Sequence, residues 1–464
     1  MQKQKTNNRV HLLDTVLRQL FLLIVWTACL TTAPLQVQAQ TAKPSVADPP
    51  EIASRYIDPV HGLGVEALIR LALQANTDLM ATRQQTVEAQ GYRRQAALIT
   101  NPGLDFSFTN GSLLGSQGER DLSVGLAHTF ELGGKRGRRI AMAQSGVEQS
   151  RQSVRDRERL LRAEITTWYG EALATARNLS VTEELYQITK QSYEMNAAQV
   201  RGGETSQLDF GLLHVEFKRL EADRLLFEHQ VERALLMLKQ LIGMPLEDAL
   251  RLSDVRPKLP LTVTLDRALA RATDLRPDLR ALRLDAEREA AAVLLARANG
   301  VPDLIGSLRF SRSTARFDQL GLTPAGTPTP LIDTDKVLTA GVSFTLPFFN
   351  RNQGGRDAAQ ARSDAAHYRK QYAEQVVRQE VRAAYSRYRA AGQALTLFDN
   401  EVMGQARNNL DILREAYRLG EVRLLDVIAE QRRLIETQHA YTNVLKEYYQ
   451  ARADMERAIG EPFE

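Results

Sequence analysis

Two short stretches of the chain alternate strictly between apolar and polar residues. The first covers 104–110 and the second 122–130, and glycine and serine are frequent between them. A period of two predicts β-strands that have one apolar and one polar face. In the first stretch Leu104, Phe106 and Phe108 alternate with Asp105, Ser107 and Thr109. The two stretches therefore predict a β-hairpin over 104–130.

The same pattern returns about 200 residues later. Residues 304–310 and 338–346 alternate in the same way and predict a second hairpin over 304–346, with a longer loop between its strands. Arg309 falls among its polar positions. The remainder of the chain from residue 65 onward reads as helix.

Apolar residues at seven-residue spacing predict two very long helices with shorter return helices. The long ones are expected at 135–201 and 352–418, and the return helices at 207–242 and 424–459. Two series seven residues apart, offset by four, form an a/d seam of the coiled-coil type: Val147, Val154, Leu161, Trp168, and Ile165, Ala172, Leu179, Tyr186, Tyr193, Val200. A helix of this length measures about 100 Å.

The whole arrangement occurs twice. At an offset of 200, Asp78-Leu79 and Pro102 match Asp278-Leu279 and Pro302, and at an offset of 217 both ends of the return helices match. We therefore predict two tandem repeats of helix, hairpin, long helix and return helix, at 65–245 and 265–464. An extended segment at 40–64 and a linker at 246–264 complete the chain. In each repeat the two shorter helices are expected to lie end to end beside the long one.

The first 39 residues read as a secretory signal peptide. A basic start precedes an apolar run at 20–30 and a small-residue cleavage pattern that ends at Ala39. Four bases and one acid here account for most of the net charge of +4, so no general nucleic-acid-binding footprint is left. Cys29 is the single cysteine and a possible lipidation site in place of cleavage. Cleavage would leave neither disulfides nor thiolate metal ligands.

The hairpins predict an oligomer. No later stretch has 18 consecutive apolar residues, so helical membrane spans are not expected. Four strands cannot cross a membrane alone, because their edge N–H and C=O groups would lie unpaired in lipid. Three chains would give a twelve-stranded β-barrel with a lumen, its inward face carrying Asp105, Ser107, Thr109 and Arg309. The alternative is a pair of soluble caps on a coiled coil.

Phenylalanines at the strand bases favour the membrane version, as aromatic girdles do: Phe130, Phe344, Phe348 and Phe349. The predicted fold class is thus mainly α with transmembrane β. It is a trimeric barrel of four strands per chain, continued by a long α-helical coiled-coil barrel.

The sequence offers no catalytic, cofactor or metal site. Nucleophile elbow, P-loop and triad patterns are missing, and Gly133-Gly134-Lys135 lacks the P-loop spacing. The histidines are scattered without an i, i+4 pair, whereas zinc needs three or four converging ligands. An inward-facing acid such as Asp105 would favour cations only electrostatically.

Several motifs resemble the TolC-type outer-membrane efflux proteins. They are the tandem repeat, Asn-Pro-Gly-Leu at 101–104 and the Arg-x-Gly-Glu-x-x-x-Leu-Asp helix turns. The strings at 133–136 and 346–354 are more narrowly similar to the heavy-metal, CzcC-like branch. The resemblance implies a trimeric exit duct in the outer membrane of a Gram-negative bacterium. A periplasmic adaptor and a proton-driven inner-membrane pump of the resistance-nodulation-division (RND) class would work with it, on a heavy-metal cation.

The two helix turns are the candidate functional residues: Arg201, Gly203, Glu204, Asp209, Arg418, Gly420, Glu421, Arg423 and Asp426. The family resemblance places adaptor contacts and the pore constriction there. In a trimer, their charges could form a ring of ion pairs that breaks on opening. Helix capping by glycine and aspartate is the simpler interpretation, and the two are compatible.

Two other functions stay open at this stage. A duct of the same build could serve drugs or secreted polypeptides, since only the short strings separate it from the metal branch. A periplasmic coiled-coil structural protein without a pore would also use the helical pattern.

Overall fold

The structure is a computed structural model that describes residues 55–58, 60–111, 118–202, 206–254 and 264–461. The expected signal peptide with Cys29, and Gly203 and Glu204 of the first helix turn, lie outside these residues.

Each repeat has the same element order. The first contains α2 (Val65–Ala75), α3 (Thr77–Ala96), β1 (Gly103–Asn110), β2 (Arg120–Phe130), α4 (Lys135–Gly202) and α5 (Gln207–Ile242). The second contains α6 (Leu265–Leu275), α7 (Pro277–Ala298), β3 (Leu304–Leu322), β4 (Pro328–Phe344), α8 (Gln353–Leu397), the π-helical turn η3 (Phe398–Val402), α9 (Met403–Arg418) and α10 (Leu424–Ile459). The predicted mainly α chain with two tandem repeats and four strands is confirmed.

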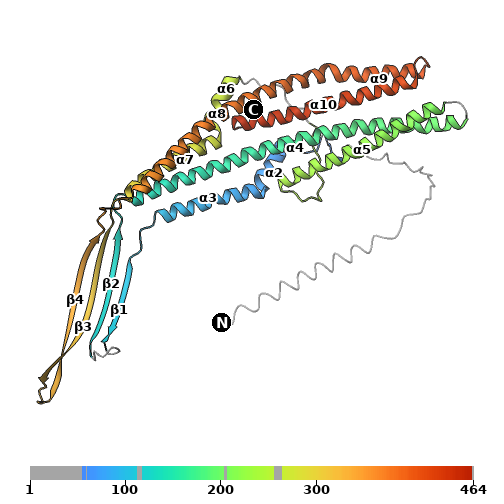
Figure 1. Cartoon of the computed structure of the whole chain (residues 1–464). Coiled ribbons are helices and arrows are strands. Elements are labelled where there is room, and N and C mark those ends of the chain that lie inside the picture. The colour runs from blue at the N-terminus through green and yellow to red at the C-terminus, as the bar shows by residue number, and fades with distance from the viewer. Residues whose placement is uncertain (1–54, 59, 112–117, 203–205, 255–263, 462–464) are drawn as a thin grey trace, which may run out of the picture. The chain divides into compact units, whose positions relative to one another are not determined.

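The long helices organise the packing. In the first repeat α4 lies along α3 and α5, and in the second α8 lies along α7 and α10; α4 also contacts α7 and α10 and so joins the repeats (Figure 1). The middle of the predicted seam lies in the core, because Leu161, Ile165, Ala172 and Leu179 are fully buried and the partly buried Val154 and Trp168 pack against them. Coiled-coil spacing therefore identified the contact face of α4 correctly.

The break between the paired short helices makes the same contact in both repeats. Asn76, between α2 and α3, accepts a hydrogen bond from the Leu79 N–H at 2.9 Å and donates one to the Leu241 carbonyl at 2.9 Å. Arg276, between α6 and α7, donates to the Ala458 carbonyl at 3.3 Å. Leu241 and Ala458 are themselves 217 residues apart, so the sequence repeat is also a repeat of contacts.

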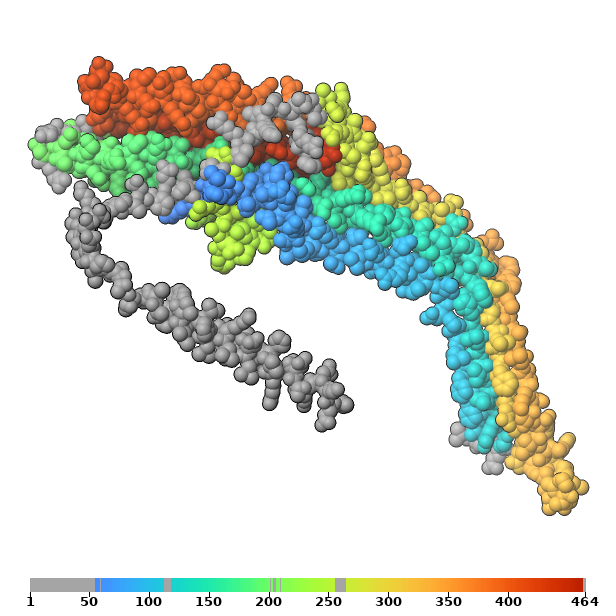
Figure 2. All heavy atoms as spheres, turned by 180° about the vertical axis from the view of Figure 1, so that it is seen from behind, coloured from blue at the N-terminus to red at the C-terminus, as the bar shows by residue number. Residues whose placement is uncertain are grey.

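The four strands form one antiparallel sheet in the order β1-β2-β3-β4. The second hairpin differs from the prediction, because β3 and β4 extend through most of the expected long loop and leave only residues 323–327 between them. Backbone pairing continues there although the apolar–polar alternation does not: Ser313 pairs with Asp335 and Thr314 with Thr334. Most side chains of the sheet are exposed, and Figure 2 shows the strands extending beyond the end of the helices.

Parts of the two segments expected to be extended or linking are packed instead. Leu252 forms parallel bridges with Ile57 and Leu63, and Leu250 and Leu252 are buried in the main core. Backbone hydrogen bonds, such as that from the Leu252 N–H to the Tyr56 carbonyl at 2.8 Å, thus join the expected lead-in (40–64) to the expected linker (246–264). The expected long helix 352–418 is helical from Gln353 to Arg418, but η3 interrupts its α-helical hydrogen bonding.

None of the helices in the described parts of the chain combines the length and the apolar composition needed to cross a membrane.

Candidate functional site

The sheet has one apolar and one polar face. Directly paired residues of antiparallel strands share a face, and Phe106 pairs with Val124, Val124 with Phe310 and Phe310 with Leu338. Near the helices this face is apolar except for one row, in which His128 pairs with Gly306. Phe130, Leu304 and Phe344 form the row closest to α4 and α7. Leu104, Phe106 and Leu338 are each more than two-thirds exposed, so this face is covered by nothing in the described chain.

Most side chains of the opposite face are polar. It carries Asp105, Ser107, Thr109 and Arg309, the residues that the alternation assigned to a common inward face. Ser107 and Ser123 share a hydrogen bond of 2.8 Å across it. The faces predicted from the sequence are therefore confirmed.

Asp105 does not present a free charge on the polar face. Asp105 pairs in register with Gly125, and Gly125 with Arg309. The Arg309 guanidinium reaches over the glycine to the Asp105 carboxylate at 3.1 Å. A Cβ atom at Gly125 would lie 2.3 Å from the Asp105 carboxylate, so the glycine makes the room for this ion pair. The sequence-based inference that Asp105 attracts cations is therefore corrected, because Arg309 neutralises its charge.

The glycine-lysine string after β2 is a structural junction. Gly133 and Gly134 adopt positive φ angles of 71° and 69°, which favour glycine. They turn the chain so that the Lys135 ammonium contacts the Asp303 carboxylate at 2.7 Å. The Leu132 N–H donates to the same oxygen at 3.1 Å. The start of α4 is thereby attached to the start of β3, as a strand-to-helix transition requires.

The turn between α9 and α10 lies at the end of the helices that is remote from the sheet (Figure 1). Gly420 ends α9 with φ +80°. The N–H groups of Gly420 and Glu421 donate to the carbonyls of Tyr417 and Ala416, both at 2.9 Å. Asp426 is the third residue of α10, and its carboxylate accepts the Arg423 N–H at 3.0 Å. The capping interpretation of Gly420 and Asp426 is confirmed.

The charged side chains of this turn pair only locally. Arg418 contacts Glu415 of its own helix at 2.5 Å, and Arg423 lies 3.8 Å from Asp426. Both arginine side chains are more than three-quarters exposed. Their guanidinium groups are thus open to a neighbouring chain, and a ring of ion pairs stays a prediction.

The turn between α4 and α5 has the same register. Arg201 lies in the last turn of α4, and Asp209 is the third residue of α5 as Asp426 is of α10. The N-cap is Ser206, whose hydroxyl accepts the Leu208 N–H at 3.1 Å. Sequence reasoning missed Ser206, although serine just before an apolar-periodic segment is a known start signal.

Several side chains join the two helical hairpins α4–α5 and α9–α10. Glu216 of α5 is almost fully buried, and its carboxylate accepts two hydrogen bonds from Arg432 of α10, at 2.8 and 3.0 Å. Further along, Thr442 donates to Asn178 at 2.7 Å. Sequence reasoning missed these contacts. The 217-residue offset was the available signal, since it places α5 and α10 at equivalent heights.

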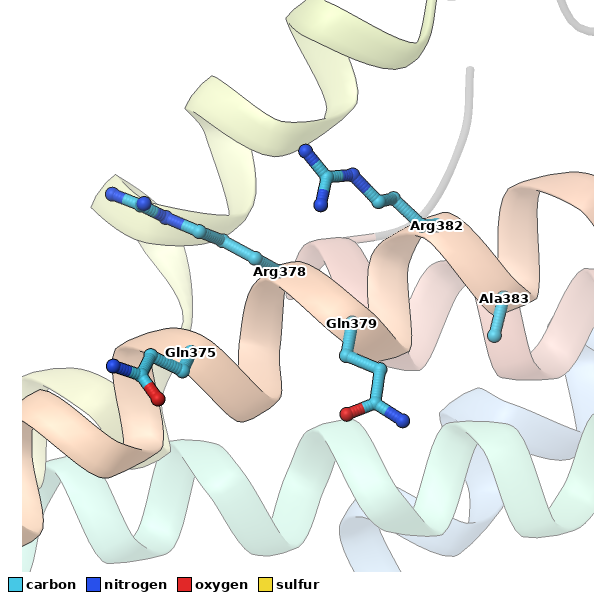
Figure 3. A pocket seen from close by; sticks show the side chains of 5 residues that line it. All are labelled: Gln375, Arg378, Gln379, Arg382 and Ala383. Carbon is cyan, nitrogen blue, oxygen red and sulfur yellow. The ribbon is translucent and has the colours of Figure 1, made fainter.

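A shallow hollow on α8 holds no constellation for chemistry. Its lining residues, Gln375, Arg378, Gln379, Arg382 and Ala383, all belong to α8, and both arginines extend from the same side of that helix (Figure 3). Among the residues that the structure describes, no group of three histidine, cysteine or acidic side chains could hold a metal ion. The arrangement that stands out is therefore the two-faced sheet at one end of the helices and the two charged turns at the other.

A family model and a curated relative both match most of the chain. The family model described as "Outer membrane efflux protein" matches residues 68–244 and 268–461. The chain is 23% identical over 403 residues to the cobalt-zinc-cadmium resistance protein CzcC of Cupriavidus metallidurans, covering 86% of this chain and 90% of that protein.

Solved structures share the fold, among them those of CusC and CmeC. A structure of CusC, studied for transmembrane channel formation, has a TM-score of 0.69 at 18% identity and covers 92% of this chain and 99% of its own. The Campylobacter jejuni CmeC outer membrane channel has a TM-score of 0.69 at 18% identity, covering 86% of each chain.

Proposed function

Because this chain belongs to the outer membrane efflux protein family, we propose that it is the outer-membrane duct of a tripartite RND efflux system for heavy-metal cations. Three copies form the duct in a Gram-negative bacterium, and it extends into the periplasm. The pump supplies the energy, and the chain itself catalyses no reaction. The bare apolar face of the sheet is the observation that carries this proposal.

The sheet edges support assembly into a ring. β1 and β4 each have one unpaired edge in the sheet order, and such edges are costly in lipid unless another copy pairs with them. The β4 edge of one copy would pair with the β1 edge of the next, a head-to-tail contact that closes on itself. Three copies give twelve strands, enough for a water-filled lumen lined by the polar face.

Exposed apolar side chains continue both edges along the helices. Val87 and Tyr92 of α3 and Val215 of α5 are 58%, 65% and 61% exposed. Tyr368 and Tyr372 of α8 and Ile412 of α9 are 69%, 70% and 60% exposed. Since α3 and α5 follow one edge and α8 and α9 the other, these two sets would bury each other in the ring, and burial of such surface favours association.

The two charged turns would form the end that meets the adaptor and closes the duct. This assignment covers Arg201, Gly203, Glu204, Asp209, Arg418, Gly420, Glu421, Arg423 and Asp426. The exposed guanidinium groups of Arg418 and Arg423 support it, because they can exchange local partners for groups on the adaptor or on a neighbouring copy. Cross-linking of the Leu419→Cys variant to the adaptor in cells would test it, and Ala361→Cys on α8 is the control that should not cross-link.

A heavy-metal cargo is supported by the similarity to CzcC. A deletion strain should become sensitive to one or more of cobalt, zinc, cadmium and copper, and the cloned gene should restore resistance. Sensitivity to antibiotics alone would instead indicate a drug duct and overturn the metal assignment.

The duct itself is tested with purified protein. We expect a trimeric mass in detergent and discrete conductance steps in planar bilayers. A monomer that stays in solution without detergent would refute the duct and favour a periplasmic structural protein.

A further inference from the structure

The apolar face of the sheet changes character at one row. Leu122 pairs with Arg312, and Arg312 pairs with Lys336. In the next row, farther from the helices, Arg120 pairs with Thr314. Arg120, Arg312 and Lys336, here called the basic rim, therefore lie on the same face as the leucines and phenylalanines, directly beyond them.

The height of the basic rim matches a membrane boundary. Along β4, Lys336 lies eight residues from Phe344, the last strand residue before the helices. Eight residues span about 27 Å along an antiparallel strand, and a strand tilted by about 40° converts this to roughly 21 Å of height. The apolar band of outer-membrane proteins is about 25 Å tall. The basic rim thus lies where hydrocarbon gives way to lipid headgroups.

The charges of the basic rim are not neutralised by any residue that the structure describes. All three side chains are exposed, and no described carboxylate forms an ion pair with any of them. The acids of neighbouring positions, Asp121 and Asp335, lie one residue along their strands and so belong to the opposite face. These three exposed cations are therefore available to an anionic group outside the chain.

We propose that the basic rim binds the phosphate groups of a phosphorylated glycolipid in the outer leaflet. Guanidinium groups bind phosphate through two parallel hydrogen bonds, and the lysine adds a point charge. Three copies of the rim around the ring hold the sheet at a defined height in the membrane. This inference rests on the membrane location in the proposed function and adds the lipid class that this surface recognises.

The test uses the full-length trimer in detergent and lipid A that carries both of its phosphates. Native mass spectrometry counts bound lipid per trimer during a titration. For Arg312→Gln/Lys336→Gln we expect affinity to fall about tenfold or more, because each base near a charged membrane surface contributes severalfold. Arg378→Gln/Arg382→Gln, which removes two exposed charges from α8, is the matched control and should bind as the native protein does.

Three results would overturn the proposal. They are equal binding by the native protein and the rim variant, equal binding of lipid A without phosphates, and loss of bound lipid A to millimolar inorganic phosphate, which would indicate a site for free phosphate. If the double variant fails to assemble, Arg120→Gln alone gives the same test with a smaller loss, about fivefold. Conductance steps from the variant would separate failure of lipid binding from failure of the duct.

Discussion

Asp105 and Arg309 face each other across Gly125, and their charges cancel within one row of the polar face. If this face lines the lumen, removing one partner exposes three like charges around the ring. Arg309→Gln should therefore shift the reversal potential in a salt gradient toward cation selectivity, and Asp105→Asn should shift it toward anions. The double variant should return close to the native value. Single variants that conduct normally with unchanged reversal potentials would show that the row does not contact the ion path.

Asp278 gives a residue-scale prediction for acid stability. Burial would raise the pKa of this carboxyl, but hydrogen bonds and charge from Arg276 outweigh burial and hold the pKa below its usual value of 3.8. A depressed pKa stabilises the folded state above pH 3.8, and this contribution is lost as the pH falls through the lower folded value.

Asp278→Asn should accordingly lower the trimer dissociation temperature at neutral pH, and its difference from the native protein should shrink below about pH 3.8. Asp266→Asn, an exposed change on α6, is the control. A difference that stays constant down to pH 2.5 would contradict the assigned cause.

At the scale of elements, the breaks between the paired short helices fix the position of these helices relative to the return helices. Asn76 both caps α3 and bonds the end of α5 through Leu241. Asn76→Ala loses both contacts and should destabilise the chain by about 1–3 kcal/mol. The measurement is the temperature at which SDS-resistant trimers dissociate, and Asn408→Ala, an exposed change on α9, should leave it unchanged.

The contact between α5 and α10 joins the two helical hairpins, and it would resist opening if the far end closes the proposed duct. Arg432 is the hydrogen-bond partner found for the buried Glu216 carboxylate among the described residues. Arg432→Ala leaves this carboxylate buried without its cation, which is unfavourable, and should loosen the two helical hairpins. We expect a higher single-channel conductance or a larger open fraction.

Arg433→Ala is the neighbouring control, because Arg433 pairs with Glu430 of its own helix. Equal conductance for both variants would exclude a closing role for the α5–α10 contact.

Much of the element order was predictable because local periodicity carries it. The burial of Leu161, Ile165 and Leu179 followed from seven-residue spacing, and the faces of β1 and β2 followed from alternation. The extent of β3 and β4 did not follow, since polar residues such as Ser313 and Asp335 pair there through the backbone alone. Asp105 with Arg309 and Glu216 with Arg432 were also unpredictable, because each pair joins residues about 200 positions apart whose register only the folded chain sets.

At the scale of the whole molecule, the first and last strands of a chain never meet each other in the described sheet. In the proposed ring, every joint between copies would take one edge from each of two chains. The sheet of one chain therefore has two unpaired edges, and a change that blocks either edge also prevents a neighbouring copy from pairing.

This arrangement has a genetic consequence. When native subunits mix evenly with subunits whose β1 edge is blocked, only about one ring in eight is assembled from native copies alone. A plasmid-borne edge variant should therefore be dominant-negative and lower metal resistance in a cell that keeps an intact gene. Arg378→Gln/Arg382→Gln on α8, which leaves both strand edges intact, should not lower resistance when it is expressed at the same level.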